Sequence, residues 1–227
     1  MSQNPFDLSR EYNAMLNQGL RLTGEDKHFF MQGRIQDLQR QLPINFSPRR
    51  ILDFGCGIGD TTCLLAETFP TAEVVGIDTA EQALDYAEAT YGSPRISFGP
   101  VREFSESNTI DLCYVNGVFH HIQPHQRLEV IQMIRKALVP GGSFAFFENN
   151  PWNPGTRLVM SRIPFDRDAQ PLTPPEARRL LREGGFASLA PPRFLFYFPK
   201  PLAIFRVVEP FLVRLPLGAQ YYVLAFK

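Results

Sequence analysis

The chain has 227 residues, of which 44% are hydrophobic and 20% are charged. At about 150 residues per domain this length predicts one domain, and the composition excludes a globally disordered chain. The 23 basic residues are balanced by 23 acidic residues, which argues against a dedicated nucleic-acid-binding protein. No apolar run predicts a transmembrane helix, the N-terminus has no signal-peptide pattern, and the three cysteines form no disulfide framework. We therefore expect a cytoplasmic protein with reduced thiols.

The N-terminal part of the chain has the apolar spacing of two helices. Apolar residues recur every three or four positions through residues 7–42, and a polar break at residues 23–26 separates the two helices. Thr23 is the candidate N-cap of the second helix, and Pro43 ends the segment.

The next part of the chain alternates short apolar runs with amphipathic stretches. The runs predict strands at residues 49–54, 73–77, 95–98, 109–115 and 143–148, and the stretches predict helices at 59–69, 80–91 and 124–138. Such alternation is typical of a parallel sheet that is covered by helices on both faces. The sequence Pro140-Gly141-Gly142 predicts a stop between the last of these helices and the strand that follows.

Prolines interrupt the pattern after residue 150. One helix is predicted at residues 174–184, and two aromatic-rich strands are predicted at 187–198 and 219–226. Between these strands, the segment 202–215 is apolar on nearly all sides of a predicted helix. Such a helix is buried, lies in a dimer contact, or touches a lipid-like molecule. Both a monomer and a homodimer remain open, as does peripheral contact with a membrane.

The most informative stretch, residues 51–62, reads ILDFGCGIGDTT and leads from a strand through three glycines into a helix. Glycines at alternate positions let a ligand lie directly on the main chain. Asp78 ends the next predicted strand, 23 positions after Gly55. An acid at this place accepts hydrogen bonds from ribose hydroxyls, so we expect a ligand that contains a nucleoside.

Two acids indicate which nucleoside ligand this is. In a dinucleotide-binding loop the sixth position is glycine and a pyrophosphate lies on the helix N-terminus, but here Asp60 stands at that position. A carboxylate there repels phosphate, and Asp53 adds a second negative charge before the loop. The loop therefore favours a cationic or zwitterionic nucleoside such as S-adenosyl-L-methionine over a nicotinamide dinucleotide.

The chain resembles the class I S-adenosylmethionine-dependent methyltransferases, in particular their small-molecule, ubiquinone-biosynthesis-like branch. The motifs that carry the resemblance are DFGCGIG (53–59), GID (76–78), IDLCYVNGVFHHI (110–122) and LVPGGSFAFFE (138–148). The resemblance implies a single α/β domain with a Rossmann-like, seven-stranded, mostly parallel sheet whose last strand is antiparallel, and with helices on both faces. Residues 1–44 would form a helical lid, 45–150 the cofactor-binding core, and 151–227 the acceptor side and the last strands.

The same resemblance assigns cofactor-binding roles by position. Asp53, Gly55, Cys56 and Gly57 would surround the methionine moiety, Asp78 the ribose, Thr79, Val101 and Arg102 the adenine, and Asn116 and Gly117 the methionine end. Members of the family carry an acid after the third strand to meet the adenine, and this chain has none, which leaves the backbone near Val101 or the Glu103 side chain for that contact. Tyr12 and Arg34 of the lid are candidates for contact with the methionine carboxylate or the acceptor, and the alternative is that these helices only cover a hydrophobic edge.

Three further residues are candidates for catalysis. His120 and His121 follow the fourth strand, where an imidazole near neutral pKa suits a general base, and packing or loop orientation is the alternative. Glu148 is either a base or an anchor for the N-terminal helices. His125 lies four residues after His121, but no third ligand stands at a known spacing, so we expect no metal site.

These observations predict an S-adenosylmethionine-dependent methyltransferase that acts on a small, partly apolar acceptor and not on nucleic acid. A lipophilic acceptor is the working hypothesis for the apolar C-terminal segment. The alternative is a non-catalytic protein that binds S-adenosylmethionine or S-adenosylhomocysteine as a sensor or scaffold.

Overall fold

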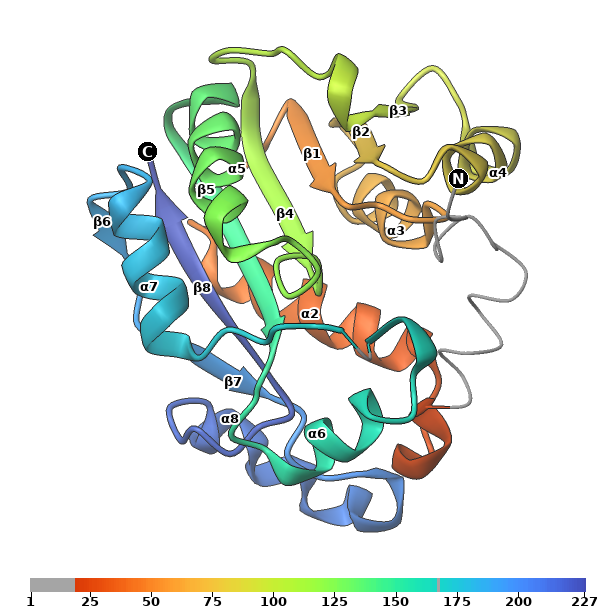
Figure 1. Cartoon of the computed structure of the whole chain (residues 1–227), viewed down its shortest axis with the longest axis vertical. Coiled ribbons are helices and arrows are strands. Elements are labelled where there is room, and N and C mark those ends of the chain that lie inside the picture. The colour runs from red at the N-terminus through yellow and green to blue at the C-terminus, as the bar shows by residue number, and fades with distance from the viewer. Residues whose placement is uncertain (1–18, 167) are drawn as a thin grey trace.

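The computed structural model describes residues 19–166 and 168–227, and its centre is an eight-stranded sheet (Figure 1). The strands are β1 (Arg50–Phe54), β2 (Glu73–Asp78), β3 (Ile96–Pro100), β4 (Ile110–Asn116), β5 (Leu138–Asn149), β6 (Ser188–Leu189), β7 (Arg193–Leu195) and β8 (Gln220–Phe226). Their order is β3-β2-β1-β4-β5-β8-β6, and β7 also pairs with β8. The first five strands are parallel, and β8 is antiparallel to β5, as predicted.

The eighth strand arises because the predicted strand 187–198 is divided in two. Pro191 and Pro192 lie between β6 and β7, and neither has an N–H to donate to the neighbouring strand. Both short strands pair antiparallel with β8, so they occupy the place of the single predicted strand.

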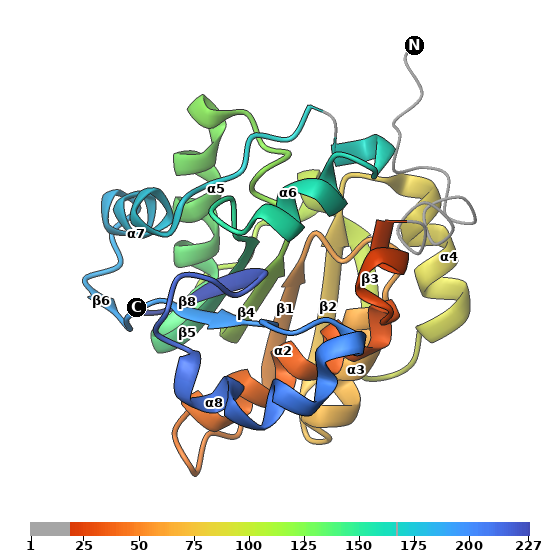
Figure 2. The ribbon, with the colours of Figure 1, turned by 90° about the horizontal axis from the view of Figure 1, so that it is seen from below.

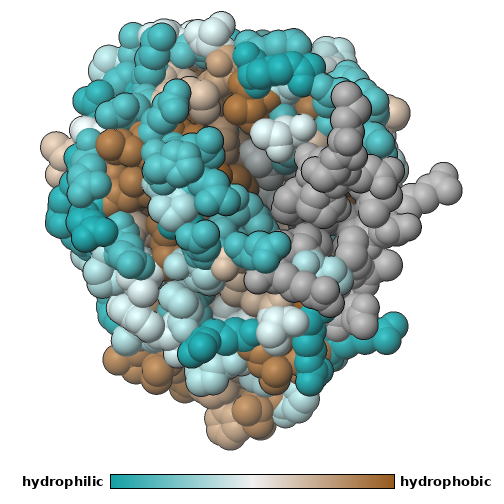
Figure 3. Space-filling model, in the orientation of Figure 1, coloured by the Kyte–Doolittle hydropathy of each residue, from teal (hydrophilic) through white to brown (hydrophobic). Residues whose placement is uncertain are grey.

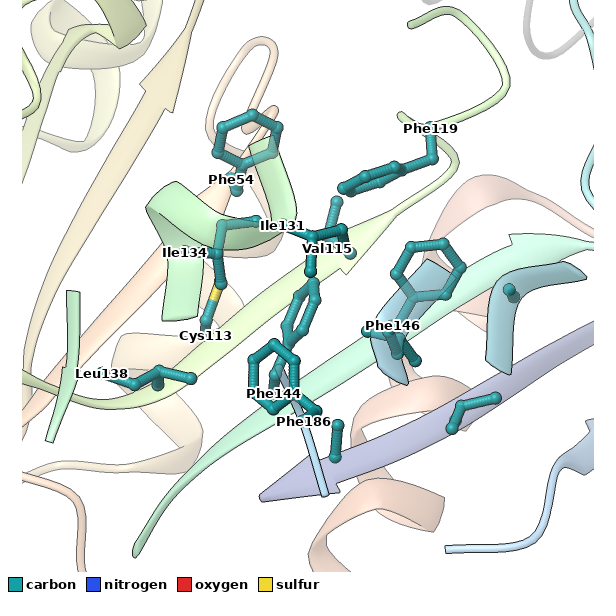
Figure 4. Packing of buried hydrophobic residues seen from close by; sticks show 14 of the residues in the cluster. Phe54, Cys113, Val115, Phe119, Ile131, Ile134, Leu138, Phe144, Phe146 and Phe186 are labelled. Carbon is teal, nitrogen blue, oxygen red and sulfur yellow. The ribbon is translucent and has the colours of Figure 1, made fainter. Parts of the chain in front are cut away.

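Helices cover both faces of the sheet (Figure 2). Helices α2 (Lys27–Gln41) and α3 (Asp60–Thr68) lie on one face, α5 (Pro124–Ala137) and α7 (Pro174–Glu183) on the other, and α4 (Glu81–Tyr91) packs beside β3. Successive residues of a strand point to opposite faces of the sheet and pack with the helices of that face. Ile51 packs with the α2 and α3 side, whereas Leu52 packs in the cluster with α5 and α7. Figure 4 shows part of that second cluster, in which rings from β5 meet aliphatic side chains of α5. Burial on both faces explains why these strands read as continuous apolar runs.

Two local expectations were wrong. The N-cap of α2 is Asp26, whose side chain accepts a hydrogen bond from the Phe29 N–H, whereas Thr23 ends the short 3₁₀ helix η1 (Arg21–Thr23). Pro140-Gly141-Gly142 does not separate a helix from a strand, because β5 already begins at Leu138. The three residues instead form an irregularity within β5, where the register against β4 shifts.

The remaining elements surround the carboxyl ends of the parallel strands or flank them. They are the 3₁₀ helices η2 (Val101–Glu103), η3 (Pro164–Asp166) and η4 (Lys200–Val208), and the helices α6 (Pro154–Met160) and α8 (Glu209–Leu212). No residue of η4 or α8 is buried. The predicted helix at 202–215 is therefore a pair of short exposed helices. Within the described ranges, no helix has the length and apolar character needed to cross a membrane.

Candidate functional site

A cavity of about 1030 Å³ lies where β1, β2 and β4 end. Of the residues proposed from the sequence, the cavity is lined by Asp53, Gly55, Cys56, Gly57, Asp78, Thr79, Val101, Asn116, Gly117, His120 and His121. Arg102 and Glu148 do not line it. The carboxyl ends of parallel strands are where open α/β sheets bind ligands, so the topology brings most of the candidate residues together.

The glycine loop needs glycine for two different reasons. Gly55 has a φ of 74°, and a Cβ built on it would lie 2.3 Å from Cγ2 of Val118, so neither the backbone nor the space admits a side chain. Gly57 has a φ of 53°, but a Cβ there would meet nothing within 4 Å. Gly57 thus presents bare backbone to the cavity, where a ligand can approach closely.

Asp78 fixes the loop and also faces the cavity. Its Oδ2 accepts a hydrogen bond of 2.8 Å from the Gly57 N–H, and its Oδ1 accepts from the N–H groups of Thr79 and Ala80. A carboxylate offers about four acceptor positions, so it can still receive hydrogen bonds from a ligand. The geometry is compatible with the ribose role implied by the resemblance.

Asp53 is buried at the end of β1, with 2% of its surface exposed, and accepts a hydrogen bond of 2.7 Å from Thr62 Oγ1. Burial raises the pKa of Asp53 to about 7, although the Thr62 hydrogen bond opposes this rise. On the neighbouring strand β4, the buried Oδ1 atom of Asn116 has no hydrogen-bond partner among the described residues, and Asn116 lines the same cavity. A cavity lined by an unpaired acceptor and an acid is suited to a ligand that brings N–H donors and positive charge.

Arg34 of α2 reaches the same end of the cavity. The guanidinium is buried and donates to Tyr114 Oη and to Gln220 Oε1, both at 3.0 Å. Within the described residues Arg34 forms no ion pair with a carboxylate, so it can receive the carboxylate of a ligand. Tyr12, the other candidate from the lid, lies outside the described residues.

The adenine side is less well defined. Val101 lines the cavity, whereas the Arg102 side chain is 65% exposed and pairs with Glu81 at 2.5 Å on the surface. Glu103 is also exposed and lies near Arg102. Among these residues only Val101 is placed for contact with an adenine ring.

Asp60 does not act as the isolated charge assumed from the sequence. Its Oδ2 forms an ion pair of 2.5 Å with Lys27 Nζ, and its Oδ1 accepts a hydrogen bond from Tyr91 Oη. Lys27 therefore offsets part of the repulsion toward phosphate. The preference for a cationic ligand rests more on Asp53 and Asn116 than on Asp60.

Glu148 and His120 form a buried pair beside the cavity. His120 Nδ1 lies 2.6 Å from Glu148 Oε2, and Glu148 Oε1 accepts from the Phe119 N–H. On the other side of the ring, His120 Nε2 is 3.6 Å from Oδ1 of Asp166, and His121 Nε2 is 3.3 Å from the same oxygen. Glu148 thus anchors the loop after β4, and among the described residues it forms no hydrogen bond with α2.

The charges of this cluster limit the roles of its members. Burial by itself lowers the pKa of His120, but Glu148 and Asp166 together raise that pKa to about 10. Burial alone raises the pKa of Asp166, and its hydrogen bonds with His120 and His121 bring it below the ordinary value. A ring that carries both protons cannot accept another one, so His120 in this state is no general base. His121, which is partly exposed and lines the cavity, is the better placed of the two.

The other end of the cavity is apolar. Phe29 and Phe30 of α2 pack around Phe196, with ring centroids 5.9 and 4.9 Å from it, and α6 contributes Val159. Arg206 of η4 is the polar residue among them. It pairs with Glu25 at 2.9 Å and lies over the Phe29 ring, while its buried Nη2 has no partner in the described part of the chain.

Among the cavity residues that the sequence analysis did not assign to the site are Asp166, Phe196 and Arg206. All three come from the segment after residue 150, where no motif marks a site. Phe196 has a φ of 62°, which is uncommon for a residue with a side chain. Only the apolar density of the segment signalled that it contributes to a binding surface.

Comparison with known proteins gives a family match for part of the chain. Residues 51–142 match the family described as a methyltransferase domain. The trans-aconitate 2-methyltransferase of Variovorax paradoxus is 32% identical over 161 residues, which are 69% of this chain and 61% of that protein. Its counterpart from Methylobacterium radiotolerans is 34% identical over 126 residues, which are 54% of this chain and 46% of that protein. The chain thus spans between 46% and 61% of the length of these two relatives.

Solved structures share the fold. A SAM-dependent methyltransferase from Archaeoglobus fulgidus superposes with a TM-score of 0.65 and 17% identity over 89% of this chain and 100% of its own. An S-adenosylmethionine-dependent methyltransferase from Mesorhizobium loti gives a TM-score of 0.61 and 21% identity over 87% of this chain and 100% of its own. The ubiquinone-biosynthesis-like branch remains a prediction, because the relatives named above carry a different name.

Proposed function

We propose that the chain methylates a small acceptor with an apolar body and an oxygen-bearing end. The premise is that it belongs to the class I S-adenosylmethionine-dependent methyltransferases and uses S-adenosyl-L-methionine as its cofactor. The single observation that carries the acceptor class is the cavity itself, which runs from the glycine loop to a wall of aromatic rings. Cavities that hold drug-sized ligands measure about 300–1,000 Å³, so there is room for a second molecule beside the cofactor.

The glycine-loop end fits the cofactor. Asn116 Oδ1 would accept from the ammonium group, Asp53 would offset its charge, and Arg34 would bind the carboxylate. Asp78 would receive the ribose hydroxyls. When bound, S-adenosyl-L-methionine supplies a methyl group that is already activated on a sulfonium sulfur. The chain then has to orient the acceptor and exclude water.

The acceptor end combines an apolar surface with one orphaned donor. The rings of Phe29, Phe30 and Phe196 offer contact to an apolar body. The unpaired Arg206 Nη2 would donate to an oxygen of the acceptor, because a buried guanidinium N–H without a partner is costly. His121 lines the same cavity and would lie beside the oxygen-bearing end of the acceptor.

The names of the relatives favour a second acceptor class, a small carboxylic acid. Arg206 could bind a carboxylate as well as a hydroxyl, but the aromatic wall would then face a polar molecule. The apolar lining therefore supports the acceptor with an apolar body as the first candidate.

A lipid-like acceptor is further supported by the outer surface of the same segment. Apolar side chains of η4 and α8 are exposed, among them Ile204 (81%), Val207 (76%) and Phe211 (84%). Figure 3 shows apolar residues along the lower edge of the molecule, where these elements lie in Figure 1. Glu209 turns inward and accepts from the N–H groups of Tyr197 and Phe198, which leaves the exposed charges of this surface basic.

The experiment measures S-adenosylhomocysteine release from the purified chain with separate acceptor pools. One pool holds apolar phenols and long-chain carboxylic acids, and the other holds small polar acids, including trans-aconitate. The proposal expects turnover with the first pool. Turnover with the polar acids alone would contradict the acceptor with an apolar body and favour a small carboxylic acid. Cofactor binding without turnover in any pool would favour the sensor alternative.

Membrane contact is tested separately by flotation with anionic and neutral liposomes. We expect the chain to float with anionic liposomes, because Lys200 and Arg214 flank the exposed apolar side chains. A chain that stays in the soluble fraction with both liposome types removes membrane contact from the proposal.

A further inference from the structure

Three side chains in the cavity wall direct their ligand atoms toward one another. They are His120, His121 and Asp166, and one ligand atom from each lies within 4.8 Å of the others. Asp166 Oδ1 is 3.3 Å from His121 Nε2 and 3.6 Å from His120 Nε2. Around a metal ion with bonds of about 2.0–2.2 Å, neighbouring ligand atoms stand about 3–3.5 Å apart. The two histidine–aspartate separations are thus close to those of a coordinated ion.

A fourth residue orients the group. Glu148 Oε2 lies 2.6 Å from Nδ1 of His120, and the Phe119 N–H holds the other oxygen of this carboxylate. A carboxylate on Nδ1 turns the other ring nitrogen toward the cavity, and such outer partners accompany most metal-binding histidines. The position of Glu148, fully buried and outside the cavity lining, is explained by this role.

The local charges also suit a cation. Glu148 and Asp166 are two buried carboxylates that face the single ring of His120. A divalent ion bound at His120 Nε2 would balance the charge of both carboxylates.

We propose that His120, His121 and Asp166 bind one divalent transition-metal ion in the wall of the cavity. Two imidazoles and one carboxylate favour Zn²⁺, Fe²⁺ or Co²⁺ over Mg²⁺ and Ca²⁺, which prefer oxygen ligands alone. Three protein ligands leave coordination positions open toward the cavity, where an acceptor oxygen can bind. Only this last step rests on the proposed methyl transfer. The sequence does not reveal the site, because Asp166 lies 45 positions after His121.

The experiment titrates tag-free, chelator-treated chain with Co²⁺ and records its visible absorption. We expect one Co²⁺ per chain, with an affinity that falls at least about tenfold in both His121→Ala and Asp166→Asn. His125→Ala is the matched control, because His125 is exposed and outside the cavity, and it should bind Co²⁺ like the parent chain. Thermal melts of all variants check that they fold.

Two results would overturn the inference: no Co²⁺ bound by the parent chain, or equal binding by the parent chain and Asp166→Asn. Calorimetry with S-adenosylhomocysteine on the same samples separates this failure from failure of the proposed function. If S-adenosylhomocysteine binds while Co²⁺ does not, the metal site is wrong and the cofactor site stands.

Discussion

The cofactor end and the acceptor end of the cavity are built from different kinds of chain segment. The cofactor end consists of loops that follow β1, β2 and β4, so the sheet register holds Asp53, Asp78 and Asn116 at neighbouring strand ends. The acceptor end combines α2 with the short elements after residue 150, which are interrupted by prolines and hold Phe196 and Arg206 by contacts far along the chain.

We expect this difference to separate effects on stability from effects on acceptor affinity. Changes at the cofactor end should alter stability and cofactor affinity together, because its loops are part of the sheet. A change of Arg206 at the acceptor end should alter acceptor affinity alone, because no residue of η4 is buried. The following predictions test this separation, from the largest expected effect to the smallest.

Gly55→Ala should reduce the free energy of unfolding by about 2–5 kcal/mol. Alanine is unfavourable in the left-handed backbone conformation of this position, and its Cβ would also clash with Val118. Gly57→Ala should cost only about 1–2 kcal/mol, because its Cβ meets open space, yet it should still weaken cofactor binding. Urea denaturation compares the two. Equal stability of the two variants would contradict the assigned packing of the loop.

Asp53→Asn should weaken S-adenosylmethionine binding and remove its pH dependence. In the parent chain the pKa of Asp53 is raised to about 7, so a cationic ligand must displace a proton below that pH. Affinity should fall about tenfold between pH 8 and pH 6. The raised pKa of Asp53 also makes the free energy of unfolding fall as the pH rises from about 4 to about 7. In this range Asp53 has lost its proton in the unfolded chain but keeps it in the folded chain. Calorimetry at both pH values checks the affinity, and a flat profile in the parent chain would contradict the role of Asp53.

Arg206→Gln should raise the KM for an oxygen-bearing acceptor about tenfold, which corresponds to the loss of one charged hydrogen bond. The affinity for S-adenosylhomocysteine should not change, because Arg206 lies at the acceptor end. Arg214→Gln is the control, since Arg214 is exposed and outside the cavity. A similar rise in KM in both variants would assign the effect to general surface charge.

Ile204→Ser and Phe211→Ser should change the free energy of unfolding by less than about 0.5 kcal/mol, because both side chains are already exposed to water. Liposome flotation should nevertheless decrease in each. Phe194→Ala, which removes a ring buried in the core, should instead destabilise the chain strongly. A large loss of stability in the serine variants would mean that η4 and α8 pack against something in solution.

Most residues that the sequence assigned to cofactor binding line the cavity, because the signals at this end are local. The spacing of Gly55, Gly57 and Asp78 reflects one strand–loop–helix unit and its neighbour, and both lie within 30 residues. The strands were found for the same reason, since burial on both faces leaves continuous apolar runs. Pro140-Gly141-Gly142 was wrongly predicted to end a helix, because its backbone conformation is determined by the pairing of β5 with β4.

The acceptor end could not be predicted because its residues meet only through tertiary structure. Nothing near His120 in the sequence indicates that Asp166 approaches its ring, or that Glu148 holds the opposite nitrogen. An error at the cofactor end has the same cause: Arg102 was predicted beside Val101 at the adenine, but its side chain pairs on the surface with Glu81. Side-chain direction in an irregular segment depends on such partners and not on spacing.

The central claim is that the glycine-loop end of the cavity binds a cationic sulfur nucleoside. Isothermal titration calorimetry of the purified chain at pH 8 with S-adenosylmethionine, with S-adenosylhomocysteine and with NADH tests it most directly. The account predicts saturable heat with both sulfur nucleosides and none with NADH. Saturable heat with NADH alone would contradict it.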